Sequence, residues 1–211
     1  MTKIRGVIFD MDGVLIDAKD WHFEALNRAL SLFGYQISRY DHLVTYDGLP
    51  TRDKLEMLSI ESGLPRGLHG FINQLKQSYT EELVHARCKP LFHHEYCLSR
   101  LKASGYRLAV ASNAVRRSVE LMTEKAGLRQ YFDTLVSNED VERAKPDPEI
   151  YLKTMGLLGL EPGACLIVED HPRGIEAGRA AGGRVVRVAD VNEVTIDNIQ
   201  RAIELAEAGA L

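Results

Sequence analysis

The sequence predicts an α/β protein with a parallel sheet, helices on both of its faces and an inserted helical segment. After Pro90, short apolar runs of strand length alternate with segments of helical periodicity, a pattern typical of βαβ units. Residues 16–88, in contrast, show helical patterns alone. Several apolar runs also end in polar side chains, and the carboxyl ends of strands in an open parallel sheet are where ligands bind.

The first elements give one strand followed by helices. An apolar run over 4–9 predicts a short buried strand. A helix follows from Asp20, which we expect to cap its start, and Gly34 is suited to end it. Thr51 is expected to cap a second helix, and apolar positions between 68 and 83 predict a third.

The second part of the chain gives the remaining strands of the sheet. Further strands are predicted at 107–111, 134–136, 165–168 and 185–188, with helices ending or lying at 98–104, 115–126, 150–158, 174–181 and 196–208. We therefore expect an α/β core made of residues 1–15 and 89–211, and a helical cap made of residues 16–88.

Composition excludes several classes of protein. The chain is 45% apolar and 27% charged, and 26 Lys and Arg against 30 Asp and Glu give a net charge of −4. Without a long run of one sign, neither nucleic acid nor a membrane surface is an expected partner. The longest apolar runs have the length of strands, so no transmembrane helix is expected. The apolar run between Arg5 and Asp10 is too short for the apolar region of a signal peptide, and Lys3 lies close before it. Three cysteines without C-x-x-C spacing indicate reduced thiols. We expect a cytoplasmic monomer.

Asp10 and Asp12 come directly after the first predicted strand. A carboxylate can attack phosphorus and form an aspartyl-phosphate, and a second carboxyl two residues on can protonate the leaving group and later activate water. Gly13 allows a tight turn that brings backbone N–H groups near a phosphate. The spacing alone is more typical of a polar turn.

Ser112, Asn113 and Lys145 are candidates for holding a phosphoryl group. Ser112 and Asn113 end the second predicted strand, where a hydroxyl and a backbone N–H can bind a phosphoryl oxygen, although either residue can cap the next helix instead. Lys145 stands before the turn Pro146-Asp147-Pro148, which would present its ammonium group from a stiff support. The alternative is an ordinary surface lysine.

Glu169 and Asp170 follow a further predicted strand. Adjacent carboxylates repel each other without a cation. With Asp10 and the backbone carbonyl of Asp12 they would suit Mg²⁺, which prefers a few protein oxygens completed by water. A loop that caps the following helix is the alternative.

Taken together and in order, these stretches resemble the four motifs of the haloacid dehalogenase superfamily of phosphotransferases, and the chain is most similar to its β-phosphoglucomutase-like phosphatases. The motifs are Asp10–Asp17, Ser112–Asn113, Lys145–Pro148 and Glu169–Asp170 with Gly174–Gly178. The resemblance covers nearly the whole chain. It implies a Rossmann-like core, a helical cap, Mg²⁺, an aspartyl-phosphate on Asp10 and acid/base work by Asp12.

The segment 45–52 is the expected specificity loop, in which Gly48 shapes the chain and Arg52 can reach the substrate or simply occupy the first turn of a helix. His22 resembles a cap histidine of the mutases and can equally be a partly buried helix residue. Phosphonate-cleaving relatives need a cap lysine. Lys54 and Lys76 are the candidates, and both are expected to be solvated surface residues.

Three functions follow from this pattern. The first is a Mg²⁺-dependent phosphatase of a small phosphorylated metabolite, with a sugar phosphate among the candidates. The second is a sugar phosphomutase of the β-phosphoglucomutase type, which must protect its phospho-enzyme from water. The third is a non-catalytic phosphate-binding module, which should have lost some of the carboxylates or the lysine; here all these positions are filled.

Overall fold

The computed structural model describes residues 2–46 and 48–211. Within them, five parallel strands form one sheet in the order β3-β2-β1-β4-β5. The strands are β1 (Gly6–Phe9), β2 (Arg107–Ala111), β3 (Thr134–Val136), β4 (Cys165–Glu169) and β5 (Arg184–Arg187). The strand that begins the chain, β1, is therefore the central one, and β2 and β4 flank it.

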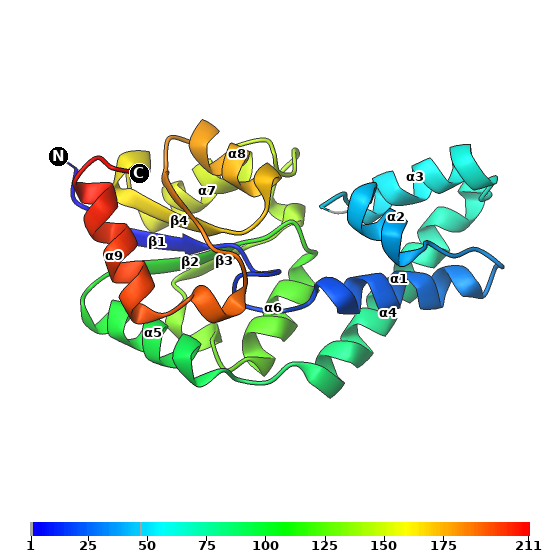
Figure 1. Ribbon diagram of the computed structural model, residues 1–211, viewed down its shortest axis with the longest axis horizontal. Coiled ribbons are helices and arrows are strands. Elements are labelled where there is room, and N and C mark those ends of the chain that lie inside the picture. Colours follow the sequence, from blue (N-terminus) through cyan, green and yellow to red (C-terminus); the bar gives the residue numbers. More distant parts are fainter. Residues whose placement is uncertain (1, 47) are drawn as a thin grey trace. The chain divides into compact units, whose positions relative to one another are not determined.

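Helices cover both faces of the sheet. In Figure 1, α5 (Phe92–Ala103) and α9 (Ile196–Glu207) lie on one face, and α7 (Glu149–Leu158) and α8 (Pro172–Ala180) lie on the other. The helix α6 (Arg116–Lys125) packs near β3. The face under α7 and α8 is filled by Ile8, Ile167, Tyr151, Met155 and other buried apolar side chains, so burial of apolar surface holds these helices on the strands.

In the described residues of the insertion between β1 and β2, four α-helices accompany a short 3-10 helix (Arg66–Leu68). The α-helices are α1 (Lys19–Ser31), α2 (Arg39–Val44), α3 (Thr51–Ser62) and α4 (His69–Arg87). Their own apolar core contains Leu30, Leu55, Leu58 and Ile72. Contacts divide the chain into one unit of residues 1–17 and 88–211 and a second unit of residues 18–87. Each unit thus has its own core.

The predicted fold class is confirmed, because a parallel sheet with helices on both faces carries a helical insertion. The strands at 107–111 and 134–136 have the predicted bounds. Two details were wrong. Asp20 lies inside the first turn of α1, whose N-cap is Ala18, and Thr51 is the first residue of α3 rather than its cap. Both shifts are of one or two residues, which is the usual uncertainty of a helix end.

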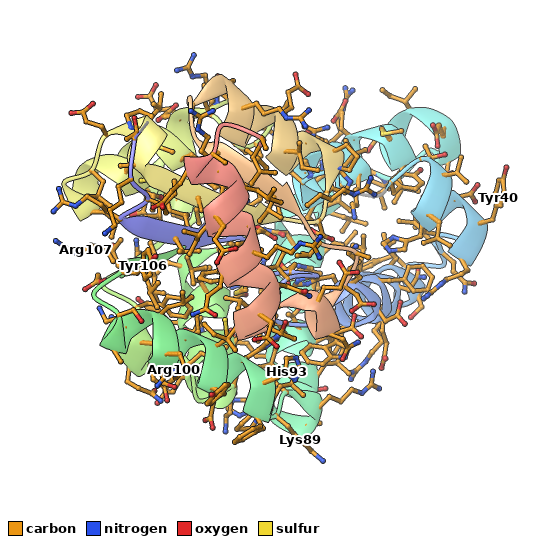
Figure 2. The ribbon with its side chains drawn as sticks, turned by 60° about the vertical axis from the view of Figure 1, so that its left-hand side comes forward. Tyr40, Lys89, His93, Arg100, Tyr106 and Arg107 are labelled. Atoms are coloured by element: carbon orange, nitrogen blue, oxygen red, sulfur yellow. The ribbon has the colours of Figure 1, made fainter. Side chains whose placement is uncertain are left out.

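Two neighbouring histidines join α5 to the turn before α9. Nε2 of His94 lies 2.7 Å from the carbonyl oxygen of Val191, and Nε2 of His93 lies 3.2 Å from the same oxygen. Figure 2 shows His93 on α5, on the side that faces α9. Burial lowers the pKa of His94 to about 4. These contacts give both histidines a structural role in this layer.

In residues 2–46 and 48–211, no helix combines the length and the apolar character that crossing a membrane requires.

Candidate active site

Three strands bring the candidate residues to one edge of the sheet. Phe9 in β1 is in register with Val110 in β2 and with Val168 in β4. The next residue of each strand therefore lies at the same level, which places Asp10 between Ala111 and Glu169. The backbone N–H of Asp10 donates to the carbonyl oxygen of Val168 at 3.0 Å, so the pairing continues to the site.

The Lys145 ammonium group is buried at this edge and has three acceptors. Its Nζ lies 2.6 Å from Oδ1 of Asp10, 2.7 Å from Oε1 of Glu169 and 2.9 Å from the carbonyl oxygen of Ala111. An ammonium group has three N–H donors, and here each has a partner. The alternative of an ordinary surface lysine is excluded, because only 4% of Lys145 is exposed.

The backbone of Lys145 is held by Asn113. Oδ1 of Asn113 accepts from the N–H of Lys145 at 3.1 Å, and Nδ2 donates to its carbonyl oxygen at 3.4 Å. Arg173 donates to the same carbonyl oxygen at 3.3 Å. Asn113 was predicted to bind phosphate. Its side-chain amide fixes the residue that carries the cation, and phosphate binding by its backbone N–H stays a prediction.

Glu169 accepts four hydrogen bonds. Its Oε1 accepts from Lys145 and, at 2.9 Å, from the hydroxyl of Tyr151. Its Oε2 accepts from the backbone N–H groups of Asp170 at 3.0 Å and His171 at 3.1 Å. The sequence analysis missed Tyr151, since a tyrosine on the apolar face of a helix gives no signal beyond core packing.

Burial and neighbouring charges shift the pKa values of the site. Burial raises the pKa of Asp10 well above its ordinary value, and the carboxylates of Glu169 and Asp12 raise it further, while Lys145 opposes this. Burial also acts to raise the pKa of Glu169, but Lys145 and the hydrogen bonds to the carboxylate leave it lowered. The pKa of Lys145 is raised by Asp10 and Glu169 against the effect of burial. The site is thus rich in negative charge.

A tight turn follows β1. Gly13 has a φ of 88°, a left-handed conformation that favours glycine, and its N–H donates to the carbonyl oxygen of Ile16 at 2.7 Å. The N–H groups of Leu15 and Ile16 both donate to Met11 at 2.9 Å. Gly13 therefore shapes the segment that carries Asp12, and its own N–H is already used within the turn.

Ser112 is buried directly after β2. Its Oγ accepts from the N–H of Ala114 at 3.1 Å, a local turn contact, whereas the N-cap of α6 is Val115, so the alternative in which Ser112 or Asn113 caps this helix is not realised. That contact uses an oxygen lone pair, so the hydroxyl hydrogen can still be donated to a second acceptor. The phosphate-binding role of Ser112 is therefore compatible with this contact and stays a prediction.

Three carboxylates at this edge form a group that can hold a metal ion. Ligand oxygens of Asp10, Glu169 and Asp170 all lie within 4.8 Å of one another, and all three residues are buried. Hard carboxylate oxygens suit Mg²⁺. A divalent cation would also offset the charge that Lys145 leaves uncompensated. The residues present therefore fit such an ion.

Two of the candidate residues in the inserted unit lie in contact, and the other two are exposed. His22 from α1 and Lys76 from α4 lie together, with Nδ1 and Nζ 3.3 Å apart. The prediction that Lys76 is a solvated surface residue was wrong, because only 8% of it is exposed. Gly48 is exposed, and Arg52 occupies the first turn of α3, with 89% of its side chain exposed and Nε 3.2 Å from Asp53. Asp47, in the same loop, lies outside the described residues.

Gly174 in α8 allows the close approach of Glu169. A Cβ atom at this position would lie 1.7 Å from Oε1 and 2.0 Å from Cδ of Glu169, so any larger residue must displace the carboxylate. The sequence places Gly174 in the fourth motif, but its spacing gives no reason for the glycine. The structure supplies one.

We expect Gly174→Ala to lower the free energy of unfolding by about 1–3 kcal/mol, because the new methyl group forces Glu169 away from its donors. Urea denaturation measures this. Gly156→Ala in α7 is the matched control. A Cβ there meets nothing within 4 Å, and the variant should be unchanged or roughly 0.5–1 kcal/mol more stable. Equal stability of the two variants would contradict the packing argument.

Comparison with known proteins identifies the class that this fold and site define. Residues 7–188 match the model of the haloacid dehalogenase-like hydrolases. The chain belongs to this family, and it is a phosphatase of the family, a hydrolase of phosphoric monoesters.

Two curated relatives are similar over most of their length. A phosphorylated carbohydrates phosphatase from Thermotoga maritima is 30% identical over 99% of this chain and 93% of its own. A phosphoglycolate phosphatase from Aquifex aeolicus is 32% identical over 85% of this chain and 82% of its own.

Solved structures agree on the fold. A β-phosphoglucomutase from Clostridium difficile superposes with a TM-score of 0.83 at 20% identity, covering 97% of this chain and 99% of its own. A putative β-phosphoglucomutase from Thermotoga maritima gives a TM-score of 0.74 at 25% identity, covering 94% and 99%. The predicted β-phosphoglucomutase-like neighbourhood within the family is thereby confirmed.

Proposed function

We propose that this phosphatase is Mg²⁺-dependent and hydrolyses a small phosphorylated metabolite, with sugar phosphates the first candidates, through an aspartyl-phosphate on Asp10. One observation carries the proposal: the buried Lys145 ammonium bridges Asp10 and Glu169 beside Asp170. Relatives named as phosphatases of phosphorylated carbohydrates and of phosphoglycolate support the substrate class.

In the first step a carboxylate oxygen of Asp10 attacks the phosphorus atom. A new O–P bond forms as the bond between phosphorus and the ester oxygen breaks, and Asp12 donates a proton to the departing alkoxide. In the second step water attacks the phosphorus of the aspartyl-phosphate, and Asp12 takes a proton from it. Inorganic phosphate leaves and the Asp10 carboxylate is regenerated.

The phosphoryl oxygens would be held from several directions. The Ser112 hydroxyl and the Asn113 backbone N–H donate hydrogen bonds, and the Lys145 ammonium supplies positive charge. Gly13 contributes the turn that aims Asp12 at the leaving group. These donors are fixed before substrate binds, as Lys145 is by its three acceptors.

Asp10, Glu169 and Asp170, with the backbone carbonyl of Asp12, would hold Mg²⁺. When bound, the ion offsets the negative charge of the carboxylates and of the phosphoryl group, which would otherwise repel one another. In the inserted unit, His22, Lys76, Gly48 and Arg52 are the proposed determinants of the leaving group.

Removing the metal tests this proposal. With p-nitrophenyl phosphate, EDTA should lower phosphate release by about 10³-fold, because an ion of this kind contributes several kcal/mol to the transition state. Adding Mg²⁺ in excess of EDTA should restore the rate. Undiminished release in EDTA would contradict a metal-dependent site. A panel of sugar phosphates, phosphoglycolate and pyrophosphate then narrows the substrate.

The same assays separate the alternatives. Interconversion of sugar phosphates without release of phosphate would favour a mutase, whose phospho-enzyme must wait for a sugar hydroxyl rather than water. Binding of Mg²⁺ and phosphate without turnover of any phosphomonoester would favour a binding module.

A further inference from the structure

Tyr151 lies behind the metal-binding carboxylates and takes no part in the chemistry proposed above. It is in the first turn of α7 with 0% of its surface exposed. Its hydroxyl donates to Oε1 of Glu169 at 2.9 Å, and its ring centroid lies 4.8 Å from Nζ of Lys145. The side chain thus touches both partners of the buried ion pair.

The hydrogen bonds of Glu169 show what this hydroxyl does. A carboxylate has about four lone-pair directions, and four donors surround this one. The backbone N–H groups of Asp170 and His171 fix Oε2, and Lys145 and Tyr151 fix Oε1. Only Lys145 and Tyr151 among these are side chains, and Lys145 must also serve Asp10. Tyr151 is therefore the side-chain donor that serves Glu169 alone within this set.

A buried tyrosine needs some acceptor for its hydroxyl, and an apolar core could supply a backbone carbonyl. Here the acceptor is a charged group of the site. The hydroxyl is the donor in this contact, because a carboxylate oxygen can only accept. Hydrogen bonds to charged groups are stronger than those between neutral groups, which makes this contact effective in orienting the carboxylate.

We propose that Tyr151 is a positioning residue that holds Glu169 in the orientation needed for metal binding and for the placement of Lys145. The proposal rests on the metal-dependent function above. Without the hydroxyl, Oε1 keeps Lys145 as its side-chain donor, and three donors instead of four hold the carboxylate. Loss of a group that orients a metal ligand typically weakens metal binding about 10–100-fold.

The test measures binding of Mn²⁺ alone, as a paramagnetic substitute for Mg²⁺ that accepts the same oxygen ligands. Titration followed by electron paramagnetic resonance should show about tenfold weaker binding in Tyr151→Phe than in wild type. Thr154→Val is the matched control. Its buried hydroxyl is on the same helix but donates to the carbonyl oxygen of Ile150, so binding should not change. In the phosphatase assay, Tyr151→Phe should lower kcat more than it alters KM.

Unchanged Mn²⁺ affinity in Tyr151→Phe would overturn the inference, as would equal weakening in Thr154→Val, which would indicate a general effect of the helix. If wild type itself bound no metal, the proposed function would fail, a result distinct from failure of the inference alone.

A second pair of variants tests the same inference if Tyr151→Phe folds poorly. 4-Aminophenylalanine at position 151 keeps a donor at the ring tip, whereas 4-methylphenylalanine fills the same space without one. The amino variant should bind Mn²⁺ with an affinity close to that of wild type, and the methyl variant should bind about tenfold more weakly. Equal affinities would overturn the proposal.

Discussion

Asp10→Asn should lower kcat for phosphate release by at least about 10⁴-fold, because it removes the proposed nucleophile. An amide oxygen is a poor nucleophile towards phosphorus, and the substitution also removes one carboxylate from the proposed metal site. The side chains of aspartate and asparagine have nearly the same shape, and the amide oxygen of asparagine can still accept a hydrogen bond from Lys145. The loss should therefore come from chemistry rather than from unfolding.

Two measurements check this prediction. Steady-state assays give the rate, and mass spectrometry of rapidly quenched wild-type enzyme should show one phosphoryl group on Asp10 and none in the variant. Asp197→Asn, an exposed aspartate in the first turn of α9, is the control and should retain the wild-type rate. Activity that survives in Asp10→Asn would mean that another group is the nucleophile.

Lys145→Met is expected to reduce the free energy of unfolding by about 3–5 kcal/mol, in addition to abolishing activity. Methionine keeps much of the length of the side chain but removes the charge. Asp10 and Glu169, of which 7% and 1% are exposed, would then face each other without their shared cation. A buried charge that loses its partner is strongly destabilising, whereas water would screen an exposed one.

The matched control is Lys102→Met. Lys102 also pairs with a carboxylate, that of Asp133 at 2.9 Å, but the two side chains are 35% and 25% exposed. Loss of this ion pair should lower the free energy of unfolding by no more than about 1 kcal/mol. Urea denaturation of both variants, with and without Mg²⁺, gives the comparison. If Lys145→Met lost no more stability than Lys102→Met, the buried ion pair would make no special contribution to the fold.

Much of this architecture could be predicted because its signals are local. The strands at 107–111 and 134–136 are apolar runs of the right length, and the turn at Gly13 needs a residue that tolerates a positive φ. The edge of the sheet where Asp10 and Glu169 meet also follows from sequence, since polar residues after parallel strands gather at one edge.

The remaining features depend on partners distant in sequence. Asn113 binds the backbone of a residue 32 positions away, and Tyr151 meets a carboxylate 18 positions away. Neither contact follows from a periodic pattern in the sequence. Asn113 was therefore expected to bind phosphate or to cap a helix, and Tyr151 gave no signal beyond core packing. The burial of Lys76 depends likewise on tertiary contacts that the amphipathic pattern of α4 does not encode.

The strand order has a consequence for how the enzyme is made. β1 lies in the centre of the sheet but precedes the other strands in the chain, so Asp10, the proposed nucleophile, is synthesised well before its neighbours on either side. Lys145 follows Asp10 by 135 residues, and Glu169 follows Lys145 by a further 24. A nascent chain that has emerged only as far as β3 contains Asp10 but lacks the cation, the remaining carboxylates and the strand β4 beside it. Catalytic competence therefore requires that synthesis has passed β4, when the partners of Asp10 on both sides of β1 are present.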